Sequence, residues 1–400
     1  MHIGLNLIFL VPGETGGMEV YARELIAALL EEAPAGTRFT AFVNRELAGA
    51  GSGRAGAGRD RHGTGAHGGA TAGVPRDPLI DALPTVAVPV SARSRVQWVL
   101  GEQTLLPPLA ARARVGLVHS LASTAPLWGP FKRVTTVHDL IYARYPEAHG
   151  GLLGRGMGLL VPAAVRRSER VIAVSESTRN DLVELLGTSG ERIDVVPNGL
   201  GSVWRVKPMP EPELRARLQL GEREIVLALS ALRPHKNLIA LVSALASIPA
   251  ARRPLLVLPG YSTWHAAELR AHSAALGVSA DVRLPGWLAG EELEGLWACA
   301  RGFVYPSLYE GFGLPVLEAM ARGVPVACAN ASSLPEVAGD AAIMFDPHEE
   351  RAIAAAIEAL LSLDGAARAR MSARGQAQAE KFTWRETARA TLGSYARALS

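Results

Sequence analysis

The sequence predicts an α/β protein built from two doubly wound, Rossmann-like domains that face each other across a cleft. Short apolar runs alternate with stretches of helical period in the first half of the 400-residue chain, and this alternation restarts in the second half. Turn formers and prolines between Asn198 and Pro212 separate the halves as a linker. Two or three domains of common size fit a chain of this length.

The first domain, residues 1–200, is expected to form a parallel sheet covered by helices on both faces. The strand Ile3–Leu10 leads into Met18–Glu31, whose apolar residues recur at helical spacing. Ser175 and Thr178 are typical of a helix start capped by a serine. Six further strands are expected at Thr37–Val43, Thr85–Val90, Gly116–His119, Val134–Val137, Val171–Val174 and Ile193–Val196.

Residues 48–78 interrupt this alternation. They are rich in Gly, Ala, Arg and His and contain almost no large apolar side chain. Because such a segment cannot bury enough surface to offset its ordering entropy, we expect a flexible surface insertion. His62 and His67 lie inside it, but they lack the spacing of a four-coordinate metal site.

The second domain, residues 210–382, is expected to repeat the alternation of strands and helices. An amphipathic helix, Arg385–Ala398, follows it and offers Leu392, Tyr395 and Leu399 for packing. Six strands are expected at Glu224–Ser230, Pro254–Leu258, Val282–Leu284, Gly302–Tyr305, Pro325–Ala329 and Ala341–Phe345.

Composition excludes several classes of protein. A net charge of +3 gives no reason to expect nucleic acid as a partner. Cys299 and Cys328 lack metal-ligand or redox spacing, which favours a reducing cytoplasm. The N-terminus has no basic leader, and no apolar run reaches the roughly 18 residues that span a bilayer. Arginines gather in the first half, which leaves open a basic face for anionic lipid headgroups or a diphosphate acceptor: Arg93, Arg95, Arg112, Arg114, Arg166, Arg167 and Arg170.

The most informative motif runs from Pro306 to Ala321. Glu310 and Glu318 bracket a glycine-rich turn, and Pro315 suits the first turn of the helix that follows. Free backbone amides at such a helix N-terminus favour a phosphate group. Glu318 lies about one turn inside the helix, where its carboxylate can accept hydrogen bonds from sugar hydroxyls. The segment therefore predicts a binding site for a sugar nucleotide.

Three other motifs follow predicted strands. Gly16 and Gly17 lie between the first strand and the first helix, where small residues let the backbone approach a pyrophosphate or an acceptor. The full dinucleotide pattern is absent, which counts against a nicotinamide enzyme. Arg233 and Lys236 follow the first strand of the second half and can neutralise a departing diphosphate. His138 ends a strand of the first half and would face the mouth of the cleft.

The stretch around Glu310 and Glu318 resembles the paired-glutamate signature of the retaining glycosyltransferases of family 4, which have the GT-B fold. The resemblance extends over nearly the whole chain. In that family an arginine directly precedes the lysine of the Lys236-Asn237 pair, where this chain has His235. The resemblance implies that the terminal helix, residues 385–400, crosses back to the first domain.

The resemblance also implies a role for each residue of the site. The residues implied in catalysis are His138, Arg233, Lys236 and Glu310. Those implied in donor binding are Gly16, Gly17, Gly311, Phe312, Gly313, Leu314 and Glu318, with Asp139 on the acceptor side. Asn330–Val337 also matches the family, without a settled role.

We expect a retaining hexosyltransferase that uses a nucleoside diphosphate sugar as co-substrate and needs no metal or tightly bound cofactor. The residues of these motifs most resemble those of mannosyltransferases of polysaccharide assembly. This resemblance favours GDP-mannose as the donor, with UDP-sugars as the alternative. The acceptor would be a glycan, a polyprenyl-linked sugar or a small molecule. We expect the chain in the cytoplasm, with peripheral contact to the inner face of the plasma membrane left open. Two alternatives remain: a sugar-nucleotide epimerase or phosphorylase of the same fold, and a non-catalytic sugar-nucleotide-binding subunit.

Overall fold

The computed structural model describes residues 1–50, 78–146, 152–201, 206–261, 263–288 and 290–400. Most of the predicted insertion, with His62 and His67, lies outside these ranges. At its two ends, residues 48–50 belong to helix α2 (Arg45–Ala50), and helix α3 (Pro78–Ala82) begins at Pro78.

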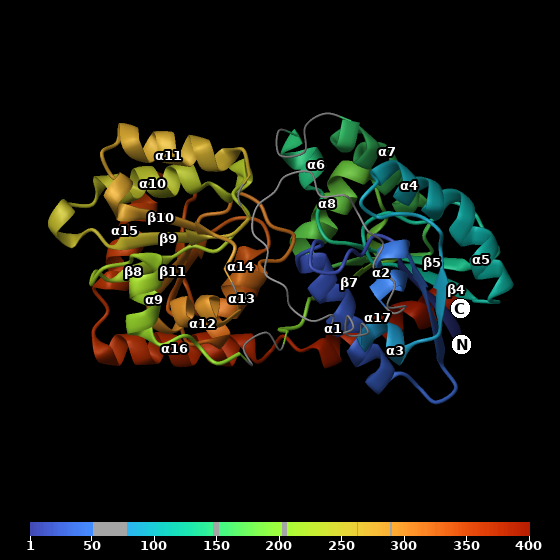
Figure 1. Ribbon diagram of the computed structural model, residues 1–400. Coiled ribbons are helices and arrows are strands. Elements are labelled where there is room, and N and C mark those ends of the chain that lie inside the picture. The colour runs from blue at the N-terminus through green and yellow to red at the C-terminus, as the bar shows by residue number, and fades with distance from the viewer. Residues whose placement is uncertain (51–77, 147–151, 202–205, 262, 289) are drawn as a thin grey trace, which may run out of the picture.

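The first half forms a seven-stranded parallel sheet in the order β3-β2-β1-β4-β5-β6-β7 (Figure 1). Its strands are β1 (His2–Leu7), β2 (Arg38–Val43), β3 (Thr85–Ala87), β4 (Leu117–Ser120), β5 (Lys132–Val137), β6 (Arg170–Ala173) and β7 (Ile193–Val195). Each strand overlaps one that the sequence predicts. The first is shorter than expected, because a turn closed by the Leu10 N–H and the Leu7 carbonyl follows it.

The second half forms a six-stranded parallel sheet in the order β10-β9-β8-β11-β12-β13. Its strands are β8 (Ile225–Leu227), β9 (Leu255–Pro259), β10 (Val282–Gly286), β11 (Ala300–Tyr305), β12 (Val326–Ala329) and β13 (Ile343–Phe345). In both sheets the chain winds outward from the middle in two directions, which is the doubly wound arrangement. The predicted fold class is confirmed.

Helices cover both faces of each sheet (Figure 1). Those of the first half are α1 (Gly17–Glu32), α4 (Arg95–Leu100), the π-helix η1 (Gly101–Leu105), α5 (Leu106–Arg112), α6 (Ile141–Arg144), α7 (Leu152–Arg167) and α8 (Glu176–Leu186). Those of the second half are α9 (Glu211–Leu218), α10 (Leu238–Ser247), α11 (His265–Ala275), α12 (Gly290–Cys299), α13 (Leu314–Ala321), α14 (Leu334–Ala338), α15 (Glu350–Leu361) and α16 (Gly365–Ala379). None of the described helices is long and apolar enough to cross a bilayer.

The last helix, α17 (Trp384–Leu399), returns from the second half and packs on α1, so that both chain ends lie on the first half (Figure 1). A buried hydrogen-bond chain fixes it there. The Tyr395 hydroxyl lies 2.7 Å from His119 Nδ1, His119 Nε2 lies 2.8 Å from Thr136 Oγ1, and that oxygen lies 3.0 Å from the Tyr21 hydroxyl. Burial lowers the pKa of His119 to about 3, so the imidazole in this hydrogen-bond chain is uncharged.

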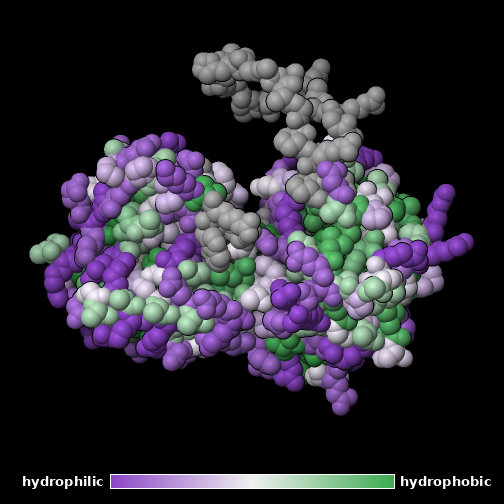
Figure 2. Space-filling model, turned by 90° about the horizontal axis from the view of Figure 1, so that it is seen from below, coloured by the Kyte–Doolittle hydropathy of each residue, from purple (hydrophilic) through white to green (hydrophobic). Residues whose placement is uncertain are grey.

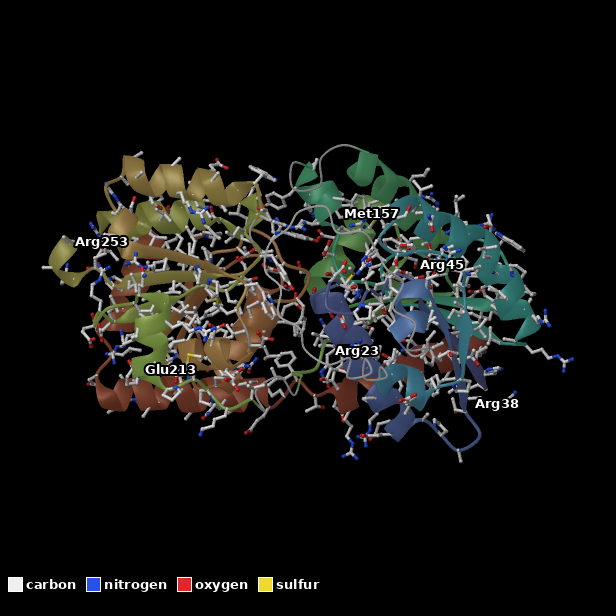
Figure 3. The ribbon with its side chains drawn as sticks, viewed as in Figure 1. Arg23, Arg38, Arg45, Met157, Glu213 and Arg253 are labelled. Carbon is white, nitrogen blue, oxygen red and sulfur yellow. The ribbon has the colours of Figure 1, made fainter. Side chains whose placement is uncertain are left out.

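Buried apolar residues form two large clusters, one under each sheet, and a small third cluster around Val161 and Val165 of α7. Met157, labelled in Figure 3, packs against this third cluster. Figure 2 shows the two halves as separate lobes with hydrophilic residues spread over much of the visible face. Cys328 is buried, whereas Cys299 is partly exposed, and both are free thiols.

The linker between the sheets makes a close backbone contact that gives a test of the fold. A Cβ on Gly199 would lie 2.3 Å from the Trp384 backbone nitrogen, at the start of α17. We expect Gly199→Ala to destabilise the protein by about 1–3 kcal/mol, because backbone on both sides must move. Thermal denaturation measures the change. Gly365→Ala is the control, since nothing lies within 4 Å of a Cβ there. Equal melting temperatures for the two variants would contradict this packing.

Candidate functional site

The loop of residues 306–313 connects β11 to α13 at the carboxyl end of the second sheet. Gly313 precedes the helix with φ +112°, a conformation that L side chains rarely adopt. Pro315 lies in the first helical turn, as the sequence predicts. The loop therefore delivers a helix N-terminus to the carboxyl edge of the sheet, where doubly wound folds bind ligands.

Two serines of the Asn330–Val337 motif hold this loop in place. Ser332 Oγ accepts a hydrogen bond of 2.8 Å from the Glu310 N–H. Ser333 Oγ donates to the carbonyls of Glu310 and Phe312, at 3.0 and 2.7 Å. This motif, whose role the sequence leaves unsettled, thus supports the backbone around Glu310.

Lys236 and Glu310 form an ion pair at the carboxyl ends of β8 and β11. Lys236 Nζ lies 2.5 Å from Glu310 Oε1 and 3.3 Å from the Tyr305 hydroxyl, and the two charged side chains are only 15% and 12% exposed. Burial alone would raise the pKa of Glu310. The charge of Lys236, with hydrogen bonds from Lys236, Ser307 and Tyr305, outweighs burial and holds that pKa below its usual value. The carboxylate is therefore ionised.

Two further charged side chains, Arg233 before Lys236 and Glu318 on α13, form no salt bridge or hydrogen bond among the described residues. Arg233 is exposed, and its backbone carbonyl accepts from the Lys236 N–H. The Glu318 carboxylate is half-buried on α13. Burial raises the pKa of Glu318, and the nearby Arg322 charge only partly offsets this. An unpaired cation and an unpaired carboxylate at one sheet edge are suited to a ligand that carries both phosphate and hydroxyl groups.

In the glycine-rich turn between the two glutamates, two apolar side chains pack against the second half, which the sequence does not predict. Phe312 is buried, with its ring 5.7 Å from that of Phe382. Leu314 packs against the core of the second half. Their side chains therefore stabilise the loop. A Cβ on Gly311 would lie 1.8 Å from the His138 carbonyl oxygen, so the glycine lets the two halves touch.

His138 lies directly across from this turn, at the end of β5. Its Nε2 lies 2.7 Å from the Leu121 carbonyl and therefore donates to it, which leaves Nδ1 as an acceptor. Burial lowers the pKa of His138, although the Leu121 carbonyl and the Asp139 charge oppose that shift. The imidazole is neutral. Asp139 Oδ1 accepts the Ile141 N–H at 3.0 Å, so this carboxylate closes the turn before α6.

Gly16 and Gly17 lie apart from the charged pair, on the first half at the N-terminus of α1. Both are exposed, Gly16 has φ +61°, and nothing lies within 4 Å of a Cβ on either residue. One turn into the same helix, the Tyr21 ring contacts the His138 ring edge-to-face at 4.7 Å. The Tyr21–His138 contact thus connects this helix to the side of the first half that faces the charged pair.

Glu336 is a contact that the sequence analysis missed. Its two carboxylate oxygens accept the N–H groups of Glu176 and Ser177, at 2.8 and 2.7 Å, at the N-terminus of α8 in the other half. Beside them, Ser175 Oγ, which caps α8 as predicted, donates to the Gly311 carbonyl at 2.6 Å. The carboxyl edges of the two sheets therefore face each other. The position of Glu336 in the Asn330–Val337 motif was the only signal in the sequence.

Three exposed aromatic side chains were also missed. Tyr261 and Trp264 follow β9, which lies next to β8 in the sheet, and Trp287 follows β10, on the far side of β9. Trp264 and Trp287 are 69% and 64% exposed. No group of three or more His, Cys, Asp or Glu side chains in the described ranges is arranged to hold a metal ion.

Comparisons with known proteins match both halves of the chain. Residues 15–201 match the family model "Glycosyltransferase Family 4", and residues 210–378 match "Glycosyl transferases group 1". The chain is 35% identical to the O-antigen chain mannosyltransferase B of Escherichia coli over 66% of this chain and 70% of that protein. It is 29% identical to the serotype-specific mannosyltransferase WbdA of Escherichia coli over 68% of this chain but only 34% of that protein.

Solved structures share the fold over nearly the whole length. One is Anabaena Alr3699/HepE in complex with UDP and glucose, with a TM-score of 0.70, 21% identity and 99% of both chains covered. Another is the sucrose-phosphate synthase of Thermosynechococcus elongatus, with a TM-score of 0.71, 20% identity, and 99% of this chain and 98% of that chain covered.

The ion pair at Lys236 gives a test by pH. Glu310 stabilises the fold above its unfolded-state pKa, near 4.5, and this stabilisation is lost as pH falls through its lower folded-state pKa. In Lys236→Met the cation is gone, so the pKa of Glu310 rises and less stabilisation remains at neutral pH. We expect the variant to unfold about 1–3 kcal/mol more easily at pH 7. The difference should shrink as pH falls toward about 4.

Thermal denaturation across this pH range measures the difference. Lys132→Met is the control, because Lys132 forms only a surface pair with Glu169, at 3.9 Å. A loss of stability in Lys236→Met that does not depend on pH would contradict the assignment of charge to Glu310.

Proposed function

Since the chain belongs to the family 4 glycosyltransferases with the GT-B fold, we propose that it transfers mannose, with retention, from a nucleoside diphosphate sugar to a glycan or lipid-linked acceptor. One observation carries the proposal. The buried Lys236–Glu310 pair lies across from His138, and Arg233 and Glu318, on the adjoining segments, have no salt bridge or hydrogen bond with any described side chain. A sugar nucleotide carries both the phosphate charge that these cations can bind and the hydroxyl groups from which a carboxylate can accept hydrogen bonds.

The second half would hold the donor. Lys236 and Arg233 would stabilise the negative charge that develops on the departing diphosphate, the electrostatic role that a metal ion fills in other enzymes. Because the bond to Glu310 already holds Lys236 in place, the site would need little reorganisation free energy when charge develops. Glu310 and the amides of Gly311–Leu314 would contact the sugar, and Glu318 would accept the ribose hydroxyls. We propose that the reaction needs no metal.

The first half would hold the acceptor. His138, neutral and with Nδ1 free to accept, would orient a hydroxyl of the acceptor or of the donor sugar. In the proposed front-face reaction, the bond from the anomeric carbon to the phosphate oxygen breaks. A new bond to the acceptor oxygen forms on the same face. The acceptor's proton passes to the leaving diphosphate.

The relatives support mannose as the transferred sugar, because the E. coli proteins named above are mannosyltransferases, and we propose GDP-mannose as its donor. UDP-sugars are the second choice, since a protein of the same fold is solved with UDP and glucose. The exposed rings of Tyr261, Trp264 and Trp287 follow β9 and β10 at the carboxyl edge of the same sheet and offer faces on which a base can stack.

A lipid-linked acceptor is supported by an apolar stripe along α4, η1 and α5. Val96 and Leu100 are exposed one turn apart, Leu105 is exposed further along, and the exposed Trp128 donates from Nε1 to the Gln103 carbonyl at 2.6 Å. Glu102 is the only acidic residue between residues 93 and 133, and it is buried. Exposed apolar side chains with an exposed indole and the exposed Arg95 suit an anionic membrane surface, although the exposed Glu14 pairs with the neighbouring Arg93.

Glu318→Ala tests the donor site. We expect the rate of mannose transfer from GDP-mannose to fall at least about 100-fold, with a smaller thermal shift by GDP, because the carboxylate that accepts the ribose hydroxyls is lost. Glu213→Ala, on the exposed outer face of α9, is the control. A screen with GDP-, UDP-, ADP- and TDP-sugars names the base. Near-wild-type transfer in Glu318→Ala would overturn the site, and product formed from the donor alone would favour the epimerase alternative.

Flotation with vesicles tests the membrane face. We expect the protein to float at low salt with vesicles that contain anionic lipid, and Leu100→Asp to reduce floating at least about 5-fold, because a carboxylate repels that surface. Val183→Asp, at an exposed apolar position on α8, is the control. Wild-type protein that stays unbound at low salt would contradict this part of the proposal.

A further inference from the structure

The hydroxyl of Tyr309 is one point where the two halves of the site exchange hydrogen bonds. Tyr309 belongs to the loop of the second half, directly before Glu310. Its hydroxyl donates to Asp181 Oδ2 at 2.6 Å and accepts the Leu140 N–H at 3.1 Å, and both partners lie in the first half. The side chain is 6% exposed, so water does not compete for these bonds.

Both ends of this connection are rigid. On the second half, Ser307 Oγ donates to the carbonyls of His235 and Tyr309, at 3.2 Å each, which ties the loop to the segment that carries Lys236. On the first half, Arg144 holds Asp181 Oδ1 at 2.6 Å. Tyr309 is therefore bonded to two segments that are themselves held by hydrogen bonds: the loop that carries Glu310 and the first-half segment around Asp181.

These two segments adjoin the groups that must meet in the proposed reaction. Leu140 lies two residues after His138, in the turn that Asp139 closes. Glu310 lies one residue after Tyr309 and pairs with Lys236. A shift of about 1 Å between such groups can lower a catalytic rate strongly, because proximity and orientation supply much of the rate enhancement.

We propose that Tyr309 is a positioning residue that sets the distance between the donor-side pair Lys236–Glu310 and the acceptor-side His138. This rests on the proposed function of the site. Tyr309 touches no reacting atom in this scheme. Its hydroxyl stays protonated, since burial and the Asp181 carboxylate raise its pKa. It can therefore keep donating to Asp181 while accepting from Leu140.

The test compares Tyr309→Phe with wild type in the full-length chain. Tyr142→Phe is the matched control, because the buried Tyr142 hydroxyl has no hydrogen-bond partner in the described structure. Two readouts are used: hydrogen exchange at the Leu140 amide, and kcat and KM for GDP-mannose. We expect exchange at Leu140 to be at least about 10-fold faster in Tyr309→Phe, because its acceptor is gone.

We expect kcat to fall at least about 10-fold while KM for the donor changes less than about 2-fold, because the donor contacts lie in the second half. Asp181→Asn, which weakens the same contact from the other side, should show the same selective loss in kcat. A general loss of stability would not produce this split.

The proposal is overturned if Leu140 exchange is unchanged in Tyr309→Phe, or if kcat matches that of Tyr142→Phe. It is also overturned if only KM rises. Wild-type protein that transfers no hexose from any nucleotide sugar would refute the proposed function instead. In that case faster Leu140 exchange would still show that Tyr309 joins the halves.

Discussion

A backbone contact between the halves determines the rest of the site: Gly311 lies so close to His138 that a Cβ would sit 1.8 Å from the carbonyl oxygen. Only glycine permits this approach. The contact presses the β11–α13 loop, which carries Glu310, onto the turn that follows β5. Around it, Ser175, Tyr309 and Glu336 add hydrogen bonds between the halves. The Lys236–Glu310 pair and the His138 imidazole are thereby held in one assembly.

The charges of the site divide into paired and unpaired groups, and the division has a physical logic. Lys236 keeps Glu310 ionised despite burial, so a cation is fixed in place before any ligand arrives. Arg233 and Glu318 have no protein partners in the described structure, so a ligand can satisfy them without breaking existing bonds. A cation that is already in place can bind an anionic ligand and stabilise negative charge on a leaving group without reorganisation of the protein.

The sequence predicted the features that depend on local pattern. All thirteen strands of the two sheets overlap predicted ones, and the Ser175 cap and the position of Pro315 agree. Contacts between the halves could not be predicted from local sequence pattern, because they depend on how two separate sheets dock. Phe312 turns its ring into the core and Asp139 closes a turn, which motif position alone does not reveal. The roles assigned to the site residues remain predictions.

The most direct measurement of the central claim is a crystal structure of the protein with a bound nucleoside diphosphate such as GDP. The account predicts the diphosphate against Lys236 and Arg233, and the ribose hydroxyls on the Glu318 carboxylate. It also predicts the terminal phosphate facing His138. A nucleotide bound elsewhere, with the Lys236–Glu310 pair unchanged and untouched, would contradict it.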